Sequence, residues 1–375
     1  MRFGAFLRPF HPLGQDPTGN FQHDLELISR LDQLGFDEAW VGEHHSGGWS
    51  PIASPELMLA AAAERTRRIM LGTGVVSLPY HHPLTAADRM VQLDHQTRGR
   101  IMFGMGAGVH PSDAHMMGIA ASDQRRMMAE SLDAIHHLLT STEPLTRKTD
   151  WFELREARLQ LRPYTRPCFE MMVAGTGTER SMRLAGKYGI NPLTLAGMAG
   201  REAPPLGKLW EAAEDEAAKN GTTVDRSKWR VAICTHIAET REEAYRQVRK
   251  GAAGWFRNYV KGTLGAAGEL PEGREVEHMV ETRTAIIGSP ADAIEAIEYL
   301  NEQSGGIGSL LHTVQNWATR RQTMDSFELF ASEVAPHFTG SVQSLRDSQA
   351  WEQSHRDDFS AQVREASRAA ANGRV

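Results

Sequence analysis

The fold is decided by two stretches, Asp37-Glu38-Ala39-Trp40-Val41-Gly42-Glu43 and Ile69-Met70-Leu71-Gly72-Thr73-Gly74-Val75-Val76-Ser77. Each is a short run rich in apolar residues, which is typical of a buried strand. The segment between them, 55–66, predicts a helix. A strand, a helix and a second strand in this order indicate parallel strands in one sheet.

The same alternation extends along most of the chain. Strands are predicted at 2–8, 37–43, 69–77, 100–106, 170–174, 189–195, 230–238 and 308–315. Helices are predicted at 22–34, 55–66, 83–97, 122–140, 177–188, 203–220, 240–261, 289–303 and 319–334, with a hairpin at 151–162. Eight strands that alternate with helices favour closure into a single (β/α)8 TIM barrel over an open, doubly wound sheet.

Two segments interrupt this pattern. Residues 262–284 contain glycine and proline without clear periodicity, and a stretch of that length predicts a lid insertion. The polar segment 341–375 predicts a C-terminal extension that docks as a helical tail or frays. We therefore expect one barrel domain over residues 1–340, followed by the extension.

Composition excludes several classes of protein. Of 375 residues, 41% are hydrophobic and 23% charged, so the chain can bury a large core. The net charge of −6 without a basic stripe argues against nucleic acid binding. Cys168 and Cys234 form no CxxC pair, which fits a reducing compartment. No run of 18 apolar residues occurs and the chain opens directly on a strand, so we expect a cytoplasmic protein without membrane contact.

Candidate functional residues follow four of the predicted strands. In a TIM barrel, active residues lie at the carboxyl ends of the strands and in the loops after them. The second strand ends in Glu43-His44-His45, and glycine-rich runs occur at 72–76, 104–108 and 174–178. Glycine lets a flat ligand or a phosphate approach the backbone closely, and a helix that begins after residue 177 favours an anion there.

These motifs resemble one known family. Glu43-His44-His45, the run Gly-Thr-Gly-Val-Val-Ser-Leu-Pro at 72–79, and Leu93-Asp94-His95 with Arg98-Gly99-Arg100 before Phe103-Gly104 resemble bacterial luciferase-like flavin-dependent monooxygenases. The resemblance covers about residues 1–335, and the stretch 35–49 looks most similar to members labelled limonene monooxygenases. It implies a TIM barrel that binds reduced FMN at the strand ends and uses O2 as a co-substrate.

The resemblance also implies roles for individual residues. His44 is the candidate for moving protons, with Glu43 and His45 as further catalytic candidates. A non-proline cis peptide under the flavin ring maps to Gly74–Val75. The remaining cofactor candidates are the neighbouring strand-end residues Thr73, Gly106, Ala107, Ala174, Gly175, Thr176, Gly177 and Thr178, and Trp49 and Phe10 are candidates for the substrate pocket.

The phosphate site departs from luciferase. Where luciferase has an arginine after its fourth strand and a glutamate after its fifth, this chain has Ala107 and Gly175. Phosphate contacts are therefore expected from backbone amides, Thr176, Thr178 or Arg180.

The implied reaction is oxygenation of a small, largely apolar organic substrate through a C4a-(hydro)peroxyflavin. Residues 104–108 lack the full GxGxxG fingerprint for NAD, so reduced FMN is expected from a separate NAD(P)H:flavin reductase. The protein is also expected to be a homodimer. Two alternatives stay open: an F420-dependent hydride-transfer enzyme of the same superfamily, and a non-catalytic flavin or ligand carrier. HExxH is absent, so no metal site is predicted.

Overall fold

The structure is a computed structural model that describes residues 1–8, 10–196, 204–265 and 270–372. Its centre is a closed barrel of eight parallel strands: β1 (Arg2–Leu7), β2 (Glu38–Val41), β3 (Met70–Thr73), β5 (Ile101–Gly106), β8 (Glu170–Gly175), β9 (Asn191–Leu195), β10 (Arg230–Ile237) and β12 (Ser309–Val314). Pairing of β9 with β10 and of β12 with β1 completes the ring. The predicted (β/α)8 barrel and its eight strands are thereby confirmed.

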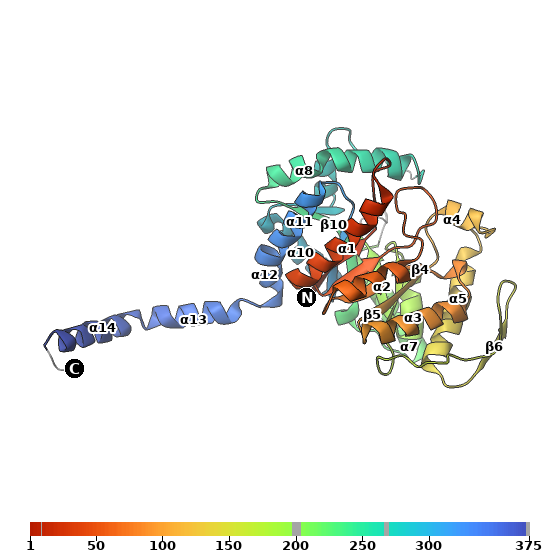
Figure 1. Ribbon diagram of the computed structural model, residues 1–375, viewed down its shortest axis with the longest axis horizontal. Helices are drawn as coiled ribbons and strands as arrows, with labels where there is room; N and C mark the ends of the chain where they lie inside the picture. The colour runs from red at the N-terminus through yellow and green to blue at the C-terminus, as the bar shows by residue number, and fades with distance from the viewer. Residues whose placement is uncertain (9, 197–203, 266–269, 373–375) are drawn as a thin grey trace.

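Helices surround the barrel, as Figure 1 shows. They are α1 (Pro17–Leu34), α2 (Pro55–Arg65), α3 (Pro83–Thr97), α5 (Gln124–Thr140), α6 (Glu179–Tyr188), α7 (Leu206–Asn220), α8 (Arg241–Trp255), α10 (Pro290–Ser304) and α11 (Arg320–Leu329). All were predicted from periodicity. Helix α1 begins five residues before the predicted start because Asp16 caps it, accepting a hydrogen bond from the Gly19 amide, and Pro17 occupies the first turn.

Smaller elements depart from the prediction. The predicted strand 69–77 is divided into β3 and β4 (Val76–Ser77) at the cis peptide Gly74–Val75, and the 3-10 turn η1 (Leu78–Tyr80) follows. The hairpin lies earlier than predicted, as β6 (Leu145–Lys148) with β7 (Glu153–Ala157). Elements not predicted are α4 (Pro111–Met116), η2 (Arg226–Lys228) and β11 (Ala285–Gly288), which pairs with the carboxyl half of β10.

The segment predicted as a lid is partly helical. Helix α8 continues into a π-helix, η3 (Phe256–Lys261), and α9 (Glu275–Glu281) forms inside the segment 262–284. Val276 and Met279 of α9 are buried in a satellite core against α8 and β11. Residues 266–269 of the segment lie outside the described part of the chain.

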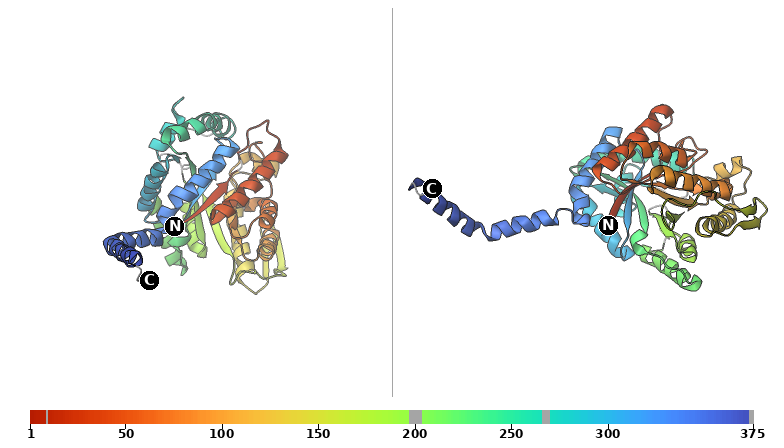
Figure 2. Two further views of the ribbon diagram at one scale, coloured as in Figure 1. Left: turned by 60° about the vertical axis from the view of Figure 1, so that its left-hand side comes forward. Right: turned by 60° about the horizontal axis from the view of Figure 1, so that its bottom comes forward.

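After α11 the chain leaves the barrel. A π-helix, η4 (Phe330–Val334), and α12 (Ala335–Thr339) lead into two exposed helices, α13 (Gln343–Ser354) and α14 (Arg356–Ala371). Figure 1 and the right-hand view of Figure 2 show these last two helices pointing away from the barrel. Throughout the described residues, each helix is too short or too polar to cross a membrane.

The amino end of the barrel is closed by buried charges. Arg230 of β10 and Glu38 of β2 are both fully buried, with Nη2 3.0 Å from Oε1. The same guanidinium forms an ion pair with Glu170 of β8 at 2.7 Å, and Glu38 accepts hydrogen bonds from Ser309 of β12 and from the indole of Trp40. Four strands are thereby tied together beneath the barrel core.

We expect Arg230→Met to lower the free energy of unfolding by about 3–5 kcal/mol, because Glu38 would stay buried with only the partly exposed Arg2 as its counter-charge. Urea denaturation would measure this loss. Arg30→Met, which breaks the exposed pair with Glu328, is the matched control and should cost less than about 1 kcal/mol. Equal losses in the two variants would contradict the role of the buried pair.

Candidate active site

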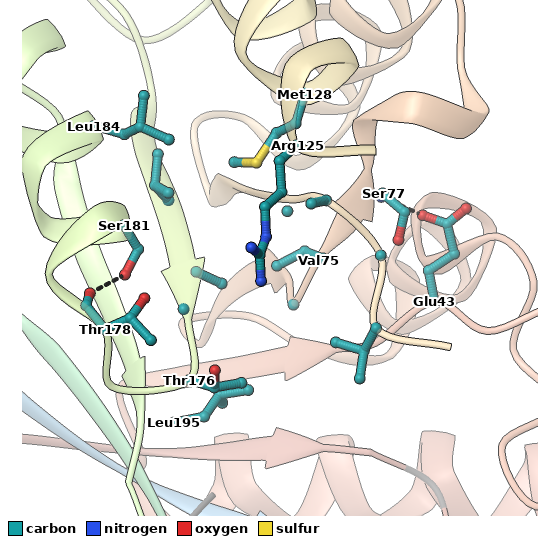
Figure 3. Close-up of a pocket in the computed structure, with 18 of the residues that line it drawn as sticks. Glu43, Val75, Ser77, Arg125, Met128, Thr176, Thr178, Ser181, Leu184 and Leu195 are labelled. Atoms are coloured by element: carbon teal, nitrogen blue, oxygen red, sulfur yellow. Dashed lines mark hydrogen bonds between the residues drawn. The ribbon is translucent and has the colours of Figure 1, made fainter. Parts of the chain in front are cut away.

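A cavity of about 570 Å³ opens at the carboxyl ends of the strands, where TIM barrels place their active sites. Its volume lies within the range typical of small-molecule sites. Figure 3 shows part of its lining. The described lining residues are Phe6, Arg8, Glu43, His44, Gly74, Val75, Ser77, Gly106, Ala107, Gly108, Val109, Arg125, Met128, Val173, Ala174, Gly175, Thr176, Thr178, Arg180, Ser181, Leu184 and Leu195.

Glu43 is held by three hydrogen-bond donors. Its Oε1 lies 2.8 Å from Nε2 of His45 and 2.7 Å from Nε2 of His81, and its Oε2 accepts from the Ser77 amide at 2.6 Å. Burial alone would raise the pKa of Glu43, but the hydrogen bonds from His45 and His81 outweigh it, so the pKa lies below its usual range. Glu43 therefore stays ionised and anchors both imidazoles. His45 lies beside Glu43 and does not line the cavity.

His44 lines the cavity and faces an aspartate. Its Nδ1 lies 3.7 Å from Oδ2 of Asp113, too far for a hydrogen bond, and has no other partner among the described residues. Asp113 is held by the backbone amide of His45 and by the hydroxyl of Ser46. Burial alone would raise the pKa of Asp113, yet His44 and Ser46 lower it. An ionised carboxylate thus sits beside the imidazole of His44.

A second histidine packs against His44 with its ring tilted by 33°. The ring centroids of His44 and His110 are 4.2 Å apart, and Nε2 of His110 lies 2.9 Å from the hydroxyl of Tyr259. Burial lowers the pKa of His110 to about 4, so its ring is neutral near pH 7. Sequence reasoning missed Asp113, His110 and Tyr259. The run His110-Pro111-Ser112-Asp113 after the fourth barrel strand was a signal for the first two, while Tyr259 arrives from the distant η3.

The same group brings three potential metal ligands together. One ligand atom from each of His44, His110 and Asp113 lies within 4.8 Å of the other two. His110 is already bound to Tyr259 and Asp113 to Ser46. Two of the three residues therefore already have hydrogen-bond partners in the protein, whereas Nδ1 of His44 has none among the described residues.

One wall of the cavity is backbone. Gly74, Val75, Gly106 and Ala107 line it, and the expected cis peptide is present at Gly74–Val75. A Cβ on Gly106 would lie 2.7 Å from the Val75 side chain, so glycine lets β5 lie close to the segment that joins β3 and β4. Thr73 does not reach the cavity, because its hydroxyl bridges the amide and carbonyl of Gly104.

The opposite end of the cavity carries anion-binding groups. Ala174, Gly175, Thr176 and Thr178 line it, and Thr178 precedes α6 without a side-chain capping bond. The first amides of α6 are therefore not capped by that side chain. Gly177, with φ +77, does not line this cavity.

Two arginines complete this end. Arg180 comes from the first turn of α6, as the sequence suggested, and Arg125 comes from α5 and was missed. Figure 3 shows the Arg125 side chain extending into the cavity between Val75 and Thr176. Among the described lining residues Glu43 is the one acid, against Arg8, Arg125 and Arg180. The cavity is therefore suited to an anionic ligand.

The two aromatic candidates for the substrate pocket, Phe10 and Trp49, lie outside the cavity lining. Phe10 and Trp49 stack with centroids 4.7 Å apart and an interplanar angle of 3°, and Tyr259 packs edge-on against Phe10. The Trp49 indole donates to the hydroxyl of Thr263 at 3.0 Å. Neither Phe10 nor Trp49 lines the cavity, so their contact with substrate stays a prediction.

These features define an α/β-barrel protein with an arginine-lined cavity at the carboxyl ends of its strands and a cluster of two histidines, an aspartate and a tyrosine beside it. The family model described as luciferase-like monooxygenase matches residues 1–306, and the chain belongs to this family of oxygenases.

Named relatives agree with this assignment. The chain is 48% identical to the 4-hydroxyprotoasukamycin monooxygenase of Streptomyces nodosus subsp. asukaensis, over 93% of this chain and 95% of that protein. It is 46% identical to the limonene 1,2-monooxygenase of Rhodococcus erythropolis, over 91% and 87%. The oxygenating constituent of 3,6-diketocamphane monooxygenase from Pseudomonas putida, solved in complex with FMN, is 27% identical, with a TM-score of 0.76 over 90% of this chain and 98% of that one.

The low pKa of His110 has a consequence for stability. Between its ordinary pKa of 6.5 and about 4, the unfolded chain binds a proton that the folded protein does not. Stability should therefore fall as the pH falls through this window, and His110→Gln should flatten the fall. Urea midpoints measured between about pH 7 and 4 would show this, with the exposed His337→Gln as the control. Parallel curves for wild type and His110→Gln would contradict it.

Proposed function

We propose that the protein is a flavin-dependent monooxygenase that binds reduced FMN in this cavity and uses O2 to oxygenate a small, largely apolar organic substrate. The observation that carries the proposal is the pairing of a flat backbone wall at Gly74–Val75 with two arginines and the start of α6. A planar ring with a phosphate arm needs these two surfaces. Relatives 46–48% identical over most of the chain are both named monooxygenases, which favours oxygenation over hydride transfer.

The anion-binding end is the proposed site of the FMN phosphate. Arg125, Arg180 and the hydroxyls of Thr176, Thr178 and Ser181 offer donors around one end of the cavity. Arginine suits this role because its planar guanidinium matches a phosphate with two parallel hydrogen bonds. Arg125 supplies a positive charge on the segment after the fourth barrel strand, where Ala107 offers none.

Bound reduced FMN would supply the electrons that activate O2. His44 would hold or deliver the proton that this chemistry requires, since an imidazole changes charge near neutral pH. Because its Nδ1 faces Asp113, the opposite ring nitrogen is the one available to a ligand. The Asp113 carboxylate would stabilise a positive charge on His44, and His110 would restrict the rotation of its ring.

The rest of the cavity would exclude water and select the substrate. Phe6, Val75, Met128, Leu184 and Leu195 present apolar side chains to the cavity. An apolar lining keeps water from the reacting groups and favours a substrate with few polar groups. The segment 262–284 would add to this exclusion as a lid.

We further propose that reduced FMN comes from a separate NAD(P)H:flavin reductase. The glycine run 104–108 begins inside β5, Gly108 has φ +83, and the short helix α4 begins only at Pro111. This geometry differs from the strand–glycine–helix turn that binds a dinucleotide. Turnover with reduced FMN but not with NADPH alone would support the two-component arrangement.

The two alternatives make different predictions. An F420-dependent hydride-transfer enzyme would turn over without oxygen, whereas the proposed oxygenase would not. A non-catalytic carrier would bind FMN without product. Aerobic incubation with reduced FMN and limonene as the probe substrate, analysed for oxygenated product, and anaerobic incubation with reduced F420, analysed for its reoxidation, separate the three functions.

We expect Arg125→Met and Arg180→Met each to weaken FMN binding about ten- to a hundredfold, because each removes a charge-assisted hydrogen bond to the phosphate. Riboflavin, which lacks the phosphate, should bind as before. Fluorescence titration measures both. Arg126→Met is the matched control, since Arg126 pairs with Asp150 and Glu130 on the exposed face of α5. Equal losses for FMN and riboflavin would place the phosphate elsewhere.

We expect His44→Gln to keep the fold and most FMN affinity, because the proposed phosphate ligands lie on other elements. Product formed per reduced FMN should fall by about two orders of magnitude or more, and hydrogen peroxide should rise to match. Chromatography of the limonene product and a peroxide assay measure the ratio. His45→Gln, which loses the bond to Glu43 but does not line the cavity, should change this ratio much less. An unchanged ratio in folded His44→Gln would remove His44 from the mechanism.

A further inference from the structure

Three side chains of the kind that bind metals meet at the edge of the cavity. His44 follows β2, whereas His110 and Asp113 belong to the loop and short helix after β5. One ligand atom of each lies within 4.8 Å of the other two. Two imidazoles and a carboxylate are a ligand set to which Zn²⁺ and other divalent transition metals bind in proteins. No motif such as HExxH announces this set, because its members come from separate loops.

The nitrogen of His44 that faces this group lacks a hydrogen-bond partner. His44 is 9% exposed, and its Nδ1 is buried without a partner among the described residues. A buried polar atom without a partner costs free energy, so such an atom points to a bound ligand or ion. Nδ1 lies 3.7 Å from Oδ2 of Asp113. That distance is too long for a hydrogen bond, but it is close to the separation of about 3.4 Å between two ligands of one tetrahedral Zn²⁺.

The carboxylate of Asp113 is held with one oxygen toward His44. Its Oδ1 accepts hydrogen bonds from the backbone amide of His45 and from the hydroxyl of Ser46. Both of these bonds go to Oδ1, and Oδ2 is the oxygen that lies beside the imidazole of His44. Carboxylates that bind a metal are commonly oriented by such hydrogen bonds to their other atoms. Asp113 therefore presents one oriented oxygen to the group.

The ring of His110 is oriented in a similar way. Its Nε2 lies 2.9 Å from the hydroxyl of Tyr259. Histidines that bind a metal usually hold an oxygen with their other ring nitrogen, which fixes the tautomer and the direction of the ring. The ligand atoms would have to approach from at most 4.8 Å to about 3.4 Å. Rotation of the imidazoles can supply this movement, because the outer torsion of a histidine side chain is broad.

Two carboxylates lie close to this group of side chains. Glu43 raises the pKa of His45 through a hydrogen bond, and Asp113 adds a smaller effect in the same direction. Arg8 brings a positive charge to the same end of the cavity, with Nη2 3.5 Å from the hydroxyl of Tyr259. The two negative charges outnumber this positive one, so the local charge favours a divalent cation.

We propose that His44, His110 and Asp113 form a binding site for a divalent transition metal such as Zn²⁺. One nitrogen of each histidine and Oδ2 of Asp113 would bind the ion, and water would complete a four-coordinate site. The binding itself does not depend on the proposed reaction. The consequence for turnover does, because a bound metal would hold the imidazole of His44 that the proposed reaction needs. Zn²⁺ would therefore act as an inhibitor.

Calorimetric titration of the metal-free, full-length protein with Zn²⁺ tests the binding. We expect wild type to bind about one equivalent, and Asp113→Asn and His110→Gln each to lower the affinity at least about tenfold, because each removes one ligand. His45→Gln is the matched control, since it keeps the backbone amide that holds Asp113 and removes a neighbouring imidazole that is not one of the three ligands. Equal affinity in all four proteins, or no binding to wild type, would overturn the proposal.

Turnover separates this proposal from the proposed function. In aerobic incubations with reduced FMN and limonene, Zn²⁺ should lower the yield of oxygenated product, and EDTA should restore it. Zn²⁺ that binds at the site but leaves the yield unchanged would count against the role of His44 in the reaction, whereas the metal site would stand.

A crystallographic measurement on wild type removes any dependence on the folding of the variants. Crystals soaked with Zn²⁺ should show an anomalous scattering peak at about 2 Å from the ligand atoms of His44, His110 and Asp113. Anomalous peaks confined to other histidines would overturn the assignment.

Discussion

The buried pair of Glu38 and Arg230 is the constraint on which the rest of the barrel depends. Two charges without solvent contact require full compensation, and here Glu170, Ser309, Trp40 and Arg2 surround the pair. Together with Glu38 and Arg230, these groups come from five strands. The positions of those strands at the amino end of the barrel are therefore fixed relative to one another. Above them, Trp40 fills the interior so closely that a Cβ on Gly72 would lie 2.3 Å from its ring.

Because the amino end of the barrel is held by these contacts, the residues at the carboxyl ends of the strands can form a cavity. Like Glu38, Glu43 is a buried carboxylate with several hydrogen-bond partners. It binds His45, His81 and the amide of Ser77 at the edge of the cavity. The glycines beside it serve two purposes. Gly72 and Gly104 make room for neighbouring barrel atoms, whereas Gly74 and Gly106 shape the cavity wall.

The group of His44, His110, Asp113 and Tyr259 joins three parts of the chain. His44 follows β2, His110 and Asp113 belong to the loop and short helix after β5, and Tyr259 comes from a π-helix beyond α8. π-Helical turns are rare and occur frequently at functional sites. Tyr259 therefore contacts both Phe10 and the His110 ring, which in turn packs against His44.

Local pattern in the sequence determined the barrel, because its parallel strands are buried runs of apolar residues and its helices have one apolar face. The position of His44 and the glycines followed from chain order, since strand ends meet at one rim. β11 was missed because four residues carry too little periodicity. Arg125, Asp113 and Tyr259 became visible only in the tertiary structure, which also showed that Phe10 and Trp49 stack on each other and do not line the cavity. Side-chain direction and contacts between distant segments arise from packing, and no local spacing along the chain encodes them.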